Sequence, residues 1–144
     1  MAKLIFAIII FLAMGSEEAL ADIAVVVNIN SETTWDSENI ENEIKSIFLG
    51  KKERFSNDMP AKPVDQKEGT PIRKSFYIKL VNKDETGMKV YWSNLIFTGN
   101  GRPPKVVGND EGVKKYISEN QNAIGYINSK SVDKSVKVIY TFKN

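Results

Sequence analysis

The sequence predicts an α/β fold in which helices cover a β-sheet of mixed strand direction. Short segments rich in β-branched residues alternate with segments whose apolar residues recur at helical spacing, and turns rich in glycine, asparagine or proline separate them. The chain shows no internal repeat and no linker-like break in composition. We therefore predict one α/β domain after a leader segment.

The first predicted elements are a strand, a helix and a second strand. The apolar run at 23–29 is typical of a strand that is buried on both faces of a sheet. Asp36 or Ser37 is the expected cap of a helix with a regularly spaced apolar face, which ends at Gly50. A short strand at 62–65 follows a loop rich in Asn, Asp and Pro.

The second half predicts three helices and two closing strands. One helix starts at Thr70-Pro71, the next spans 84–97, and the third is capped by Asn109. Strands at 123–127 and 136–142 complete the sheet, and the partial alternation of the last one predicts an edge or half-exposed strand.

The N-terminus predicts export. A short basic start is followed by the apolar run Leu4–Met14, and Ala19-Leu20-Ala21 has the small-x-small pattern of a cleavage site. We predict a signal peptide at 1–21 and a periplasmic domain at 22–144. The apolar run is well short of the ~20 residues that span a bilayer, so we expect no stable membrane insertion.

Composition argues against several functions. The leader contains one of the 20 basic and two of the 18 acidic residues, so the mature chain carries a net charge of +3, spread along its length. This charge is too small and too dispersed for a nucleic-acid binder. The chain has no His and no Cys, which removes the usual general base, nucleophile and transition-metal ligands. We predict neither an enzyme nor a metal or cofactor site.

The run Val64–Arg73 is the strongest functional signal. It ends a strand, turns at Gly69, and opens a helix with Thr70 at the cap and Pro71 in the first turn. Such a start directs backbone N–H groups and the positive end of the helix dipole at one place, and Arg73 adds a guanidinium one turn later. We call residues 69–73 the anion cup. Gly, Thr and Pro here are equally explained by ordinary turn and cap chemistry.

Two other features belong to this interpretation. The loop Thr98–Pro104 carries Arg102 between glycines and prolines, and it fits either a ligand-facing loop or a plain connector. Asp65, beside the cup, could accept a proton from hydrogen phosphate or pair with a neighbouring lysine. The candidate ligand-binding residues are Gln66, Gly69, Thr70, Arg73 and Arg102.

Several of these motifs together resemble a known family. They occur in the order Ile47–Lys51, Val64–Gln66, Gly69–Arg73, Tyr91-Trp92, Phe97–Gly99 and Ala123–Tyr126. In this order, from about residue 40 to 127, they are similar to the substrate-binding proteins of phosphate ABC transporters. The resemblance implies a type II periplasmic binding fold, whose two α/β lobes close over an oxyanion. The length of this chain implies a single lobe.

The resemblance also implies which residues would bind the anion. Gly69 and Thr70 match the family's Ser-Gly-Thr helix start, whereas Glu68 stands where the family has the serine and Val64 where it usually has an arginine. Glu68 would repel an oxyanion and Val64 offers no donor. Arg73 is our hypothetical replacement for the missing guanidinium.

The resulting prediction is a periplasmic, non-enzymatic binding protein for a small oxyanion, with phosphate as the first candidate. An ABC permease or a second copy of the chain is the expected macromolecular partner. The alternative is a single lobe that has lost its ligand and acts as an interaction, assembly or sensory accessory protein of the cell envelope.

Overall fold

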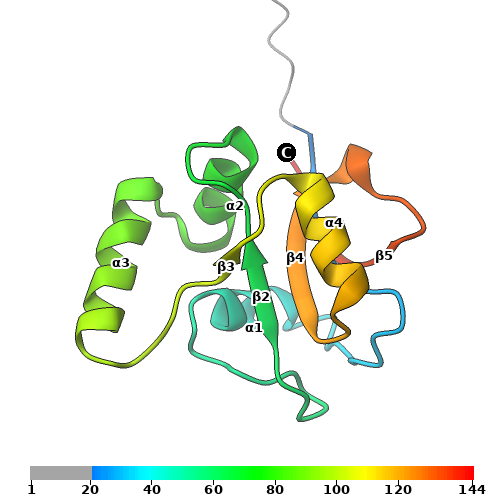
Figure 1. Ribbon diagram of the computed structural model, residues 1–144, viewed down its shortest axis with the longest axis horizontal. Coiled ribbons are helices and arrows are strands. Elements are labelled where there is room, and N and C mark those ends of the chain that lie inside the picture. Colours follow the sequence, from blue (N-terminus) through cyan, green and yellow to red (C-terminus); the bar gives the residue numbers. More distant parts are fainter. Residues whose placement is uncertain (1–20) are drawn as a thin grey trace, which may run out of the picture.

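Five strands form one mixed sheet in the computed structural model, which describes residues 21–144 (Figure 1). The strands lie in the order β3-β2-β4-β1-β5. β1 is antiparallel to both of its neighbours, and β2 is parallel to both of its own. Their bounds are β1 Ile23–Asn28, β2 Lys62–Asp65, β3 Lys105–Val106, β4 Ala123–Asn128 and β5 Val136–Phe142. The predicted mixed α/β fold is confirmed.

Within residues 21–144, four α-helices surround this sheet. α4 packs on one face, α1 and α2 pack on the other, and α3 lies beside the β3 edge (Figure 1). Their bounds are α1 Ile40–Phe48, α2 Pro71–Val81, α3 Glu85–Phe97 and α4 Asp110–Glu119. A 3-10 turn, η1, follows β4 at Ser129–Ser131.

The burial of β1 explains its apolar sequence from Ile23 to Val27. Val25 and Val27 face the larger core under α1, α2 and α3, while Ala24 and Val26 face the smaller core under α4. Because successive strand residues point to opposite faces, a strand covered on both sides must be apolar throughout. β5 lies at the edge of the sheet, as predicted.

The structure differs from the sequence predictions at the start of α1 and at β3. α1 begins at Ile40, and the cap predicted at Asp36 or Ser37 is wrong, because the Asp36 carboxylate instead accepts the N–H of Glu38 within a preceding turn. The two-residue strand β3 was not predicted. It follows Pro103 and Pro104 and is too short to show any sequence period.

The N-terminal predictions fall largely outside the described residues. The predicted signal peptide lies there apart from Ala21. Among residues 21–144, the helices are all too short or too polar to cross a membrane.

Gly125 provides a test of the packing in the smaller core. An alanine Cβ at this position would lie 2.6 Å from Val113 Cγ1 and 3.0 Å from Val64 Cγ2. We expect Gly125→Ala to lower the free energy of unfolding by about 1–3 kcal/mol because the core must shift to admit the methyl group. Gly101→Ala is the matched control, since its nearest contacts would be an ordinary 3.8 Å. Urea unfolding of both variants compares them, and equal losses would contradict the predicted overpacking.

Candidate functional site: the N-terminus of α2

The anion cup lies at the start of α2, after the loop that connects β2 to α2, at one end of the sheet (Figure 1). Gly69 has a φ of 88°, which an L side chain rarely adopts, and Thr70 is extended before Pro71 opens the helix. The first helical hydrogen bond runs from the Lys74 N–H to the Thr70 carbonyl. The N–H groups of Ile72 and Arg73 therefore have no carbonyl partner within the helix.

Thr70 does not cap the helix with its side chain. Its hydroxyl donates to the Lys67 carbonyl at 2.8 Å, and the backbone N–H of Thr70 bonds to the same oxygen at 3.3 Å. Within residues 21–144 no side chain caps the N-terminus of α2. The positive end of the helix is thus left to solvent or to an anion.

α3 supplies two charged contacts to the loop that leads into the cup. Both carboxylate oxygens of Glu85 accept from the Gly69 N–H, at 2.9 and 3.1 Å. Lys89, one turn further along α3, lies 2.6 Å from the Glu68 carboxylate. Lys89, and more weakly Arg73, hold the pKa of Glu68 below its ordinary value. The repulsion expected from Glu68 is therefore offset by a lysine from another helix.

Arg73 turns its guanidinium back toward the end of β2. Nη1 donates to the Gln66 carbonyl at 3.2 Å, and Nη2 lies 3.8 Å from the Asp65 carboxylate. The guanidinium carbon is 5.8 Å from the centre of the Tyr77 ring. The side chain keeps 15% of its surface exposed, so it is not fully enclosed by these contacts.

Asp65 lies below the cup, which corrects the interpretation of it as a loop carboxylate that pairs with lysine or phosphate. It is the last residue of β2 and is 2% exposed. Its carboxylate accepts from Tyr77 Oη at 2.6 Å, from Tyr126 Oη and from the Gln66 N–H at 2.8 Å. A carboxylate so occupied holds Arg73 in place but is not available to a ligand.

The side chain of Gln66 also forms its hydrogen bonds within the protein. Its side-chain amide is buried and donates to Asp110 Oδ1 at 2.7 Å and to the Tyr126 carbonyl at 2.9 Å. These bonds tie the end of β2 to the first residue of α4. Sequence reasoning missed Tyr77, Tyr126 and Asp110, although a tyrosine inside a buried strand is itself a signal that a polar partner is near.

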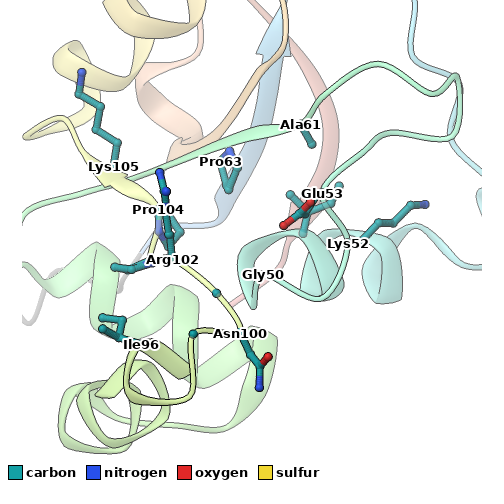
Figure 2. A pocket seen from close by; sticks show the side chains of 14 residues that line it. Gly50, Lys52, Glu53, Ala61, Pro63, Ile96, Asn100, Arg102, Pro104 and Lys105 are labelled. Carbon is teal, nitrogen blue, oxygen red and sulfur yellow. The ribbon is translucent and has the colours of Figure 1, made fainter. Parts of the chain in front are cut away.

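Arg102 lies in a different hollow. It lines an open groove of about 1230 Å³ between the end of α3, the 99–105 loop and the start of β2, with Lys52, Glu53 and Lys105 around it (Figure 2). Gln66, Gly69, Thr70 and Arg73 do not line this groove. The structure therefore brings four of the five candidate residues together and sets Arg102 apart from them.

The buried tyrosines predict a loss of stability at alkaline pH. Burial, and then the Asp65 charge, raise the pKa of both Tyr77 and Tyr126 well above the ordinary value of 10.0. The unfolded chain releases these protons near pH 10 while the folded chain retains them, so the free energy of unfolding must fall as pH rises above 10. Urea unfolding across this range should show a shallower fall for Tyr77→Phe. Tyr116→Phe is the control, and an identical pH slope for Tyr77→Phe and the unmodified protein would contradict the linkage.

No protein-family model and no curated protein matches the sequence. Solved structures do match. An ABC-type phosphate transport receptor from Vibrio cholerae superposes with a TM-score of 0.62 at 23% identity, over 83% of this chain and 46% of the receptor. A phosphate ABC transporter substrate-binding protein from Clostridium perfringens, solved with bound phosphate, superposes with a TM-score of 0.61 at 25% identity. The match covers 83% of this chain and 45% of that protein. PstS from Borrelia burgdorferi superposes with a TM-score of 0.58 at 16% identity, over 83% of this chain and 47% of PstS.

The fold is that of the phosphate ABC transporter substrate-binding proteins. This confirms the resemblance read from the motifs. The chain spans less than half the length of these substrate-binding proteins, which agrees with a single-lobe version. Val64, where the family usually has an arginine, is buried in the smaller core under α4. Its side chain contributes to packing at a position where the resemblance implied an anion contact.

Proposed function

We propose that this protein is a periplasmic, non-enzymatic binding protein that holds a small oxyanion at the N-terminus of α2. Phosphate is the first candidate ligand, and the protein would take part in ABC-type uptake. The observation that carries the proposal is the start of α2, where the N–H groups of Ile72 and Arg73 have no carbonyl partner within the helix and no side chain within residues 21–144 caps them. A helix start of this kind favours anions through both its donors and its dipole.

Three further points support an anion here. The Glu85 carboxylate already lies against the Gly69 N–H, so this end of α2 does attract negative charge. Arg73 and Lys89 bring two positive groups to the same loop. The Clostridium perfringens protein with bound phosphate shares this fold at 25% identity.

A single lobe offers an oxyanion one wall of a binding site. An oxyanion held by one wall stays partly hydrated, so we expect weaker binding than in a closed cleft. A second copy of this chain or an ABC permease would supply the opposite wall. Mass determination with and without phosphate tests the first arrangement, since pairing across the site requires a phosphate-dependent dimer.

Titration calorimetry at low salt, with phosphate and then sulfate, tests the proposal. We expect saturable binding that Thr70→Val weakens by about 1 kcal/mol and Arg73→Ala by about 1–3 kcal/mol. Arg102→Ala is the matched control, since it removes the same charge in the separate groove. Circular dichroism must first show that each variant is folded, because Arg73 also lies against buried Asp65. Absence of heat from the folded protein with either anion would refute the proposal.

A second candidate function is an interaction module of the cell envelope without a ligand. It is favoured by the exposed apolar side chains of α3, Val90, Ile96 and Phe97, of which Phe97 has 92% of its surface free. An apolar helix surface of this kind is typical of a contact with another protein. The calorimetric result decides between the two, because the module binds no anion.

A further inference from the structure

The hydrogen bonds between Glu85 and Gly69 join the start of α3 to the loop before α2. Neither segment requires this contact for its own secondary structure. Glu85 is the first residue of α3, but α3 is capped by Asp84, whose carboxylate accepts the Gly87 N–H at 2.8 Å. The Glu85 carboxylate is therefore not required to cap its own helix. It reaches across to the residue before the cap of α2 instead.

This carboxylate occupies a donor of the anion cup. Both of its oxygens lie within 3.1 Å of the Gly69 nitrogen, the distance that a phosphate oxygen would take at the same N–H. A carboxylate and a phosphate are alike in charge sign and in acceptor chemistry, and both cannot hold this N–H at once. Glu85 also adds a negative charge that, with Glu68, balances Arg73 and Lys89 around the loop.

We propose that Glu85 is an internal competitor of the oxyanion: its carboxylate occupies the Gly69 N–H of the anion cup, and an incoming oxyanion binds by displacing it from this donor. This inference rests on the function proposed above and names how that site is regulated. The displaced carboxylate remains next to the N-terminus of its own helix, and Lys89 lies four residues further on, so both accommodate its charge.

The movement that this requires is small. Tyr91 Oη donates to the Leu49 carbonyl at 2.6 Å, and Met88 and Trp92 are buried in the larger core. These contacts hold α3 beyond its first turn. Displacement of Glu85 therefore removes one contact of the first turn of α3 and leaves the rest of the helix packed on the body.

Phosphate titration of Glu85→Gln tests the competition. Glutamine keeps the shape and one acceptor oxygen but loses the charge, so it holds the Gly69 N–H more weakly. We expect phosphate to bind Glu85→Gln about tenfold more tightly than the unmodified protein. Glu85→Asp is a second variant, because it retains the charge but shortens the reach, and we expect a similar gain. Urea unfolding confirms that both are folded.

Glu111→Gln is the matched control. Glu111 also lies in the first turn of a helix, α4, and pairs with Lys114, so this substitution makes the same change in net charge away from the cup. We expect no more than a twofold change in phosphate affinity. Hydrogen exchange gives a second readout: phosphate should accelerate exchange in residues 84–88 of the unmodified protein severalfold and leave residues 110–117 unchanged.

The outcomes separate the two proposals. Saturable phosphate binding that Thr70→Val weakens but Glu85→Gln and Glu85→Asp leave unchanged overturns the competition and keeps the oxyanion receptor. An equal gain in Glu111→Gln also overturns it, since the effect would then be general electrostatics. No binding to any of these folded proteins overturns the receptor itself, and the competition with it.

Discussion

Replacement of Asp65 with alanine is expected to lower the free energy of unfolding by about 3–5 kcal/mol. Asp65 is buried at the end of β2 and accepts hydrogen bonds from the phenols of Tyr77 and Tyr126. Its removal leaves both buried hydroxyls without this acceptor and the guanidinium of Arg73 without its carboxylate partner. Each unsatisfied buried group costs its desolvation free energy, and a charged group costs more than a neutral one.

Urea unfolding at neutral pH measures this effect, and Asp65→Asn is the informative companion. Asparagine keeps one oxygen as an acceptor but loses the charge opposite Arg73, so its loss should be smaller than that of alanine. Glu119→Gln is the control, since Glu119 is exposed at the end of α4. A change below about 1 kcal/mol for Asp65→Ala would mean that water satisfies the tyrosines, and the network would then not fix the cup.

The order of the elements was predictable because burial imposes a period on each of them. β1 is apolar from Ile23 to Val27 because two cores cover it, and α1 carries its apolar residues on one face because only that face packs on the sheet. The start of α2 was predictable from Gly69, Thr70 and Pro71, since a left-handed turn and a fixed φ have local sequence causes.

The contacts that position or occupy the groups of the anion cup were not predictable, because each joins residues that are distant in the chain. Tyr126 reaches Asp65 across 61 positions, and Glu85 reaches Gly69 across 16. Local pattern places a tyrosine in a strand and a glutamate in a first turn, but it does not say which loop packs beside them. The same limit applies to Arg102, whose loop looked suitable for the ligand yet lines another groove.

Phe76→Ala is expected to cost about 3–5 kcal/mol of unfolding free energy, because it opens a cavity where the larger core meets the site. Phe76 is fully buried in α2, one turn after Arg73. Its ring stacks on Tyr126 with centroids 3.8 Å apart and meets Phe48 edge-on at 5.0 Å. Loss of the ring therefore removes apolar contact and also the surface that positions the Tyr126 hydroxyl against Asp65.

Phe97→Ala removes the same ring from a position that is 92% exposed, which makes it the matched control for Phe76→Ala. A ring that contacts only water in the folded chain contributes little to folding, so we expect a change within about 0.5 kcal/mol. Urea unfolding of the two variants side by side measures the difference. If Phe97→Ala lowered the free energy of unfolding as much as Phe76→Ala, the exposed side of α3 would be covered by another protein in solution. This result would favour the interaction module over the oxyanion receptor. A large loss confined to Phe76→Ala instead places the stability of this lobe in the aromatic cluster beneath the anion cup.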